Sequence, residues 1–130
     1  FTITIPAYYL LIQIYDKQLN LIFKYGANFY SSPELQLFIK DAVAKDKVVV
    51  FSKTYCPYCK MAKEVFDKVK QPIKVIELNE RDDGDAVQDN LSHITGFRTV
   101  PQVFINGNCV GGGSDVKALL ESGKLKHILA

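Results

Sequence analysis

Apolar residues recur with a helical period over residues 35–43 of the chain and then change to a continuous run over 48–51. The helical segment follows the sequence SSPE at 31–34, where we interpret Ser31 as the helix cap and Pro33 as a first-turn residue. A short continuous apolar run is typical of a strand that is buried on both faces. The pattern therefore predicts a helix that leads into a central strand.

Further changes of period predict the remaining elements. They are a helix with an apolar stripe from 61 to 69, a strand at 73–78, a helix at about 85–95 closed by Gly96, strands at 102–105 and 109–110 around an Asn106-Gly107 turn, a helix to about 122 and a short helix at 124–129. Two strands joined through a helix imply a parallel pair, and the later hairpin adds antiparallel strands. We therefore predict an α/β fold with a mixed sheet flanked by helices.

Residues 1–30 differ from the rest of the chain. They are rich in Ile, Leu, Tyr and Phe, and Asp16 is their only acid. The lack of a basic n-region and a cleavage site argues against a signal peptide, and the lack of arginine argues against a transit peptide. We treat residues 1–30 as an N-terminal extension of unknown role and residues 31–130 as the domain. A targeting remnant, a packed or loosely ordered extension and an upstream translated artefact are the alternatives.

Composition and charge exclude several function classes. The chain has 130 residues, 48% of them apolar and 23% charged, which suits one soluble domain. A net charge of +2 is too small to argue for nucleic acid or an anionic membrane. An odd count of 3 cysteines fits a reducing compartment. We expect a monomer with no nucleic-acid or membrane partner, located in the cytoplasm, or in mitochondria if residues 1–30 are a targeting remnant.

The stretch TYCPYCK holds the candidate chemistry, because it places two cysteines where a buried strand ends and a helix begins. Pro57 suits an early helix position, since its missing N–H would be unpaired there. Cys56 then lies at the helix N-terminus, where free N–H groups, Lys53 and Lys60 favour a thiolate that attacks disulfides. Cys59 lies about one turn further in. We therefore predict an exposed nucleophile, Cys56, and a more buried resolving thiol, Cys59.

Two other uses of a CxxC pair are weaker. Zinc takes four ligands, and the chain has no second CxxC, while Cys109, His93 and His127 are scattered without ligand spacing. A structural disulfide across four residues closes a small loop and stabilises little. We expect no metal, and we interpret Cys109 as a small apolar residue packed in the last strand.

Three separated motifs resemble those of the dithiol glutaredoxins, which belong to the thioredoxin-fold superfamily. KTYCPYCK, TVPQVFING and GGGSD occur in the family's order and spacing, and the resemblance covers roughly residues 34–130. It implies a thioredoxin fold with a mixed four-stranded sheet flanked by helices. It also implies glutathione as co-substrate, glutathionylated or disulfide-bonded proteins as substrates, and glutathione reductase as an indirect partner.

The resemblance further implies which residues bind glutathione, a tripeptide with two carboxylates and an ammonium group. Lys53 resembles the family's basic residue for the glycine carboxylate, and Tyr58 would line the groove beside the sulfur. Gln88 matches a polar contact from the third helix, and Arg98 occupies a position that is usually Lys or Arg.

The later motifs would bind the rest of the tripeptide. In Thr99-Val100-Pro101 the family proline is cis, which would turn the Val100 backbone toward the cysteinyl part of glutathione. The turn formed by Gly112, Gly113, Ser114 and Asp115 begins a helix. Its free N–H groups suit the γ-glutamyl carboxylate, and Asp115 suits the ammonium group.

The function that these residues favour is glutathione-dependent thiol–disulfide exchange through Cys56. A [2Fe–2S] cluster held between two subunits with two glutathiones is the alternative, and the family trend is that proline at the position of Pro57 disfavours it. A thioredoxin-like reductase fed by a flavoenzyme is a third hypothesis. Thioredoxins usually carry a tryptophan beside the cysteine pair, and this chain has none.

Overall fold

The computed structural model describes residues 32–130, so the predictions for residues 1–30 lie outside the described residues. The elements are α2 (Pro33–Lys45), β1 (Val48–Ser52), α3 (Pro57–Lys68), β2 (Lys74–Glu77), the 3₁₀ turn η1 (Leu78–Glu80), α4 (Gly84–Thr95), β3 (Gln102–Ile105), β4 (Asn108–Gly111), α5 (Gly113–Glu121) and α6 (Lys124–Leu129). None of these helices has the length and apolar character that crossing a membrane requires.

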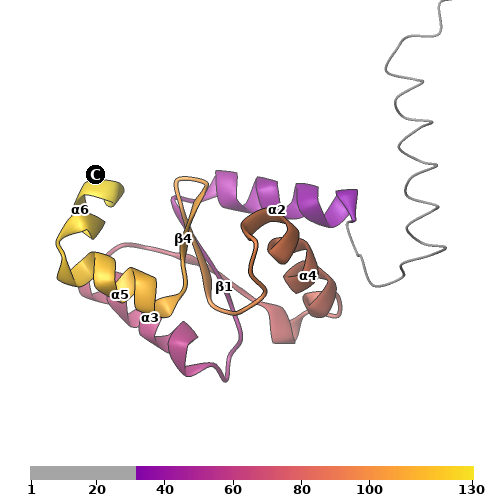
Figure 1. Ribbon diagram of the computed structural model, residues 1–130, viewed down its shortest axis with the longest axis horizontal. Coiled ribbons are helices and arrows are strands. Elements are labelled where there is room, and N and C mark those ends of the chain that lie inside the picture. Colours follow the sequence, from indigo (N-terminus) through magenta and orange to yellow (C-terminus); the bar gives the residue numbers. More distant parts are fainter. Residues whose placement is uncertain (1–31) are drawn as a thin grey trace, which may run out of the picture. The chain divides into compact units, whose positions relative to one another are not determined.

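The four strands form one mixed sheet in the order β2-β1-β3-β4. β1 pairs with β2 in parallel, with Val50 opposite Val75, and with β3 in antiparallel, with Val50 opposite Val103. The predicted α/β fold with a mixed four-stranded sheet is therefore confirmed. Figure 1 shows α2 and α4 together on one side of the sheet and α3, α5 and α6 together on the other.

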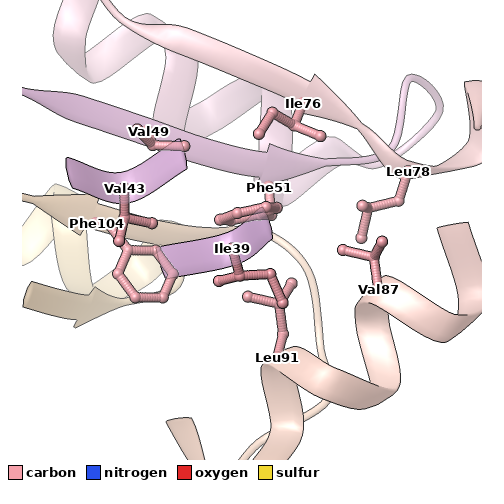
Figure 2. Packing of buried hydrophobic residues seen from close by; sticks show 9 residues of the cluster. All are labelled: Ile39, Val43, Val49, Phe51, Ile76, Leu78, Val87, Leu91 and Phe104. Carbon is pink, nitrogen blue, oxygen red and sulfur yellow. The ribbon is translucent and has the colours of Figure 1, made fainter. Parts of the chain in front are cut away.

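Strand β1 is buried on both faces, as its apolar run predicted. Val49 and Phe51 belong to the apolar cluster under α2 and α4, whereas Val48 and Val50 belong to the cluster under α3, α5 and α6. Successive side chains of a strand point to opposite faces, so one continuous apolar run supplies both cores. Figure 2 shows the first cluster, in which Phe51 meets Phe104 edge to face with ring centroids 5.7 Å apart.

The cap of α2 is Ser32, so the assignment of the cap to Ser31 was wrong by one residue. Ser32 Oγ accepts the Leu35 N–H at 3.3 Å, and Pro33 is the first helical residue. Proline is favoured at that first position, where its missing N–H is no loss, so the residue just before it becomes the cap.

Two other boundaries test the sequence pattern. The strand expected over 73–78 is confined to Lys74–Glu77, because Leu78 begins η1 and packs into the core as part of that turn. The end of α4 is confirmed: Gly96 follows the helix in the left-handed conformation with φ 89°, which glycine adopts without a steric penalty.

Two leucines on helices provide a matched test of this packing. Leu91 in α4 is fully buried, whereas Leu37 in α2 is 59% exposed. We expect Leu91→Ala to lower the free energy of unfolding by about 2–5 kcal/mol, because it leaves a cavity in the core. Leu37→Ala should change it by less than about 0.5 kcal/mol. Denaturant unfolding of both variants checks this, and equal losses would contradict the assigned core.

Candidate active site

Cys56 is the N-cap residue of α3, and Pro57 follows as the first helical residue, as the sequence predicted. Cys56 Sγ accepts the Cys59 N–H at 3.3 Å and donates to the Val100 carbonyl oxygen at 3.7 Å. The first bond satisfies one of the N–H groups that a helix start leaves without a partner. The Cys56 side chain is partly exposed, so its sulfur is both held at the helix start and reachable.

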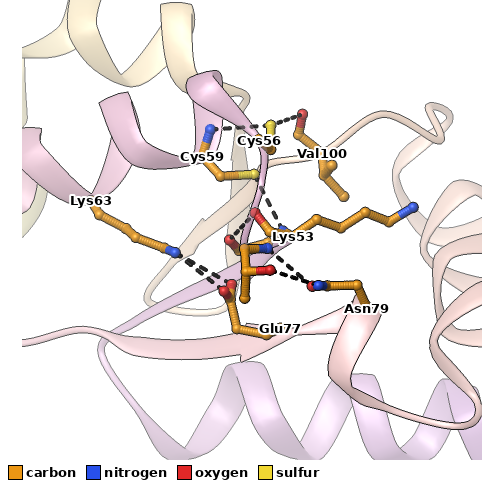
Figure 3. A network of polar contacts seen from close by, with 9 residues as sticks. Lys53, Cys56, Cys59, Lys63, Glu77, Asn79 and Val100 are labelled. Carbon is orange, nitrogen blue, oxygen red and sulfur yellow. Dashed lines mark hydrogen bonds and ion pairs between the residues drawn. The ribbon is translucent and has the colours of Figure 1, made fainter.

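Cys59 is the buried member of the pair. It has no exposed surface, and its Sγ accepts the Lys53 N–H at 3.5 Å (Figure 3). Burial raises the pKa of the Cys59 thiol, and its hydrogen bond with Cys56 raises it further, while hydrogen bonds from Lys53 and Ser52 lower it. Cys59 therefore keeps its proton at neutral pH, and the predicted division into an accessible and a buried thiol is confirmed.

A groove beside the Cys56 sulfur brings most of the predicted binding residues together. It is lined by Tyr58, Phe97, Thr99, Val100, Pro101, Gly111, Gly112, Gly113, Ser114 and Asp115. The Val100–Pro101 peptide bond is cis, as the resemblance implied. Phe97 lies outside the three motifs, and Gly111 is the first residue of GGGSD but was not named as a binding residue.

The start of α5 packs directly on the first turn of α3. A Cβ at Gly113 would lie 2.5 Å from the Tyr58 carbonyl oxygen, so only glycine allows this approach. Asp115 Oδ2 accepts the Gly112 N–H at 2.8 Å. The carboxylate of Asp115 is thereby fixed at the wall of the groove, next to first-turn N–H groups that helices leave without intrahelical partners.

Three predicted binding residues do not line this groove. The Lys53 ammonium extends away from the polar network in Figure 3 and forms no ion pair within residues 32–130. Arg98 Nε donates to Asp89 Oδ1 at 2.6 Å. Gln88 is only 5% exposed; its Nε2 donates to the Arg98 carbonyl oxygen at 2.7 Å, and its Oε1 has no partner in the described part of the chain.

Comparison with known proteins identifies the family. A family model described as Glutaredoxin matches residues 48–110, which run from β1 to β4 and include both active-site cysteines. Glutaredoxin-C4 from Arabidopsis thaliana is 52% identical over 99 residues, which cover 76% of this chain and 73% of that protein. This chain belongs to the glutaredoxin family.

Solved glutaredoxins share the fold. Oxidised glutaredoxin 2 from Chlamydomonas reinhardtii has a TM-score of 0.71 and 48% identity, over 74% of this chain and 91% of that chain. The buckwheat glutaredoxin–glutathione complex has a TM-score of 0.70 and 40% identity, over 75% of this chain and 93% of that chain. The glutaredoxin domain therefore has the thioredoxin fold that the resemblance implied.

A reciprocal side-chain pair supports the loop that precedes Cys56 and was not predicted. Asn79 Oδ1 accepts the Thr54 N–H at 3.0 Å, and Asn79 Nδ2 donates to Thr54 Oγ1 at 2.6 Å (Figure 3). The pair ties this glutaredoxin's active-site loop to η1. No local signal marks Asn79, because its partner lies 25 residues away in sequence.

Cys109 lies in β4, but it is exposed, so its interpretation as a packed apolar residue was wrong. β4 is an edge strand of the sheet, and its first two residues, Asn108 and Cys109, face solvent. Among residues 32–130, no group of three His, Cys, Asp or Glu side chains is arranged to hold a metal ion.

The raised pKa of Cys59 predicts slow alkylation. In a Cys56→Ser protein, burial of Cys59 is unchanged, so its thiolate fraction at pH 7 should stay below that of a thiol with the ordinary value of 9.0. We expect iodoacetamide to modify Cys59 at least about tenfold more slowly than free glutathione at pH 7, and the rate to keep rising above pH 9. Peptide mass spectrometry separates Cys59 from Cys109. A Cys59 rate equal to that of glutathione would contradict the assignment.

Proposed function

We propose that this glutaredoxin is a glutathione-dependent thiol–disulfide oxidoreductase that reduces protein–glutathione mixed disulfides and protein disulfides through Cys56. The observation that carries the proposal is the asymmetry of the pair: Cys56 is reachable at a helix N-terminus, and Cys59 is buried one turn below it. The buckwheat relative was solved as a complex with glutathione, which supports glutathione as the co-substrate.

The groove suits the charges of glutathione. The first-turn N–H groups of Gly113 and Ser114 would meet the γ-glutamyl carboxylate, because a helix N-terminus attracts anions. The Asp115 carboxylate, fixed by the Gly112 N–H, would meet the ammonium group. The Val100 backbone would pair with the cysteinyl part in the manner of an added strand.

In the reaction with a mixed disulfide, the Cys56 thiolate attacks the sulfur of the glutathione moiety. A new bond forms between Cys56 and glutathione, the bond to the substrate sulfur breaks, and the substrate leaves as a thiolate that takes up a proton. A second glutathione thiolate then attacks the glutathionyl sulfur on Cys56. This step releases oxidised glutathione and restores the Cys56 thiolate, so glutathione replaces the two electrons that Cys56 gave to the substrate in the first step.

A disulfide within a protein substrate requires Cys59. Cys56 attacks one substrate sulfur and forms a mixed disulfide, after which Cys59 loses its proton and attacks the Cys56 sulfur. The substrate leaves with both thiols, and the Cys56–Cys59 disulfide is reduced by two glutathiones in turn. Glutathione reductase would act only indirectly, by regenerating glutathione from its oxidised form.

The alternative function, binding of a [2Fe–2S] cluster, would use the same Cys56. Visible absorbance of the purified protein distinguishes it from the oxidoreductase. Thiolate ligands suit such a cluster, and a bound cluster absorbs visible light. Freshly purified full-length protein with no visible absorbance, together with glutathione-linked turnover, supports the oxidoreductase. A coloured protein without turnover favours the cluster.

Substitution of each cysteine separates their roles. We expect Cys56→Ser to abolish all turnover, because the remaining thiol of the pair, Cys59, is buried out of reach of a substrate. Cys59→Ser should retain reduction of a glutathionylated peptide while losing most reduction of protein disulfides. The assay couples oxidised glutathione to glutathione reductase and NADPH. Turnover in the Cys56→Ser protein would refute the assignment of the nucleophile.

Substitution of Lys53 tests whether a positive charge near the cysteines contributes to binding of the glutathionylated substrate. We expect Lys53→Gln to raise KM for the glutathionylated peptide about two- to fivefold, the range typical of one partly exposed ion pair, and the effect should shrink at high salt. Lys68→Gln is the matched control, because Lys68 is an exposed lysine at the far end of α3. Equal effects of the two substitutions on KM would count against a role for Lys53.

A further inference from the structure

The loop between α4 and β3, residues 96–101, forms one wall of the groove. Its backbone is not held by the regular backbone–backbone hydrogen bonds of a helix or a strand. In residues 32–130, the backbone–backbone hydrogen bonds outside helices and strands include only one from this loop, in which the Gly96 N–H donates to the Ser92 carbonyl at 2.8 Å. Polar backbone groups in folded proteins nevertheless need partners. Side chains donate to three carbonyls of this loop, those of Phe97, Arg98 and Val100.

Gln102 provides the first of these partners. It is the first residue of β3 and has no exposed surface. Its Nε2 donates to the Phe97 carbonyl oxygen at 2.7 Å, and its Oε1 accepts from Thr95 Oγ1 at 3.0 Å. Thr95 Oγ1 also accepts the Phe97 N–H at 3.4 Å. The buried carboxamide of Gln102 thus links Thr95, at the end of α4, to Phe97 in the loop.

Gln88 provides the second partner from the opposite direction. Its Nε2 donates from α4 to the Arg98 carbonyl oxygen at 2.7 Å, and its side chain is also buried. Two consecutive carbonyls, those of Phe97 and Arg98, are therefore held by carboxamides from two different elements. A buried donor without an acceptor is costly, so displacement of the loop would leave these amides unsatisfied.

The held segment leads directly to the reactive sulfur. Thr99 and Val100 follow the two fixed carbonyls and line the groove, and the Val100 carbonyl oxygen lies 3.7 Å from Cys56 Sγ. Gln102 itself does not line the groove. It can influence a ligand there only through the backbone that it holds.

We propose that Gln102 is a positioning residue for glutathione binding: together with Gln88 it fixes the backbone of Thr99 and Val100 beside Cys56. The proposal rests on the proposed function, since glutathione is the ligand whose binding depends on this backbone. These hydrogen bonds hold the loop in place before glutathione binds. Less conformational entropy is therefore lost on binding.

The test compares Gln102→Leu with Gln71→Leu. Gln71 Nε2 donates to the Pro72 carbonyl oxygen at 2.9 Å in a loop that does not line the groove, so the control removes the same kind of bond. We expect Gln102→Leu to raise KM for a glutathionylated peptide about tenfold, which corresponds to about 1.4 kcal/mol, with kcat within about twofold of wild type. Gln71→Leu should change neither. An unchanged KM in a folded Gln102→Leu protein overturns the proposal.

A second measurement does not depend on glutathione. The Phe97 N–H, which Thr95 Oγ1 accepts beside the Gln102 contact, should exchange about tenfold faster in Gln102→Leu and at an unchanged rate in Gln71→Leu. If the wild type shows no glutathione-linked turnover, the proposed function fails, while the exchange rates still decide whether Gln102 holds the loop. Should Gln102→Leu not fold, Gln102→Met removes the Nε2 donor while keeping an unbranched side chain, and wild-type exchange and KM in that variant overturn the proposal.

Discussion

The hydrogen bond from the Cys59 N–H to the Cys56 sulfur, 3.3 Å long, is the interaction on which the rest of the site depends. A helix start must satisfy its first N–H groups, and here a thiol sulfur serves as the cap. The hydrogen bond that caps α3 therefore also holds the nucleophilic sulfur of Cys56 in place. It places Cys59 one turn inside the helix, in the protein interior, which explains why the two cysteines of one motif differ in exposure and why burial raises the pKa of Cys59.

The sheet explains why distant motifs meet at that sulfur. β1 runs antiparallel to β3, and Phe51 near the end of β1 lies opposite Gln102 at the start of β3. The segment that leaves β1 and the segment that enters β3 consequently emerge at the same edge. The first leads to Cys56 and the second comes from Val100, so antiparallel register brings together residues 44 positions apart. Burial of β1 on both faces keeps this junction rigid.

Buried polar side chains in this domain stabilise irregular segments at the ends of regular elements. Asn90 Oδ1 accepts the Ser32 N–H at 3.0 Å, just before α2 begins, and Gln88 and Gln102 hold the loop after α4. Each carboxamide would be costly in the core without these partners. These three carboxamides thus bond to backbone groups outside the helices and strands, and two of them, Gln88 and Gln102, hold the loop that forms one wall of the groove.

The sequence by itself determined the order of the elements, the buried central strand and the position of Cys56 at a helix start, because period, Pro57 and apolar runs are local properties. The family motifs added most of the residues that line the groove. Only the tertiary structure decided the exposure of Cys109, the Thr54–Asn79 pair and the burial of Gln88 and Gln102 beneath the loop. A polar side chain looks the same in sequence whether it faces water or a backbone carbonyl, since its environment is created by segments that meet only when the chain folds.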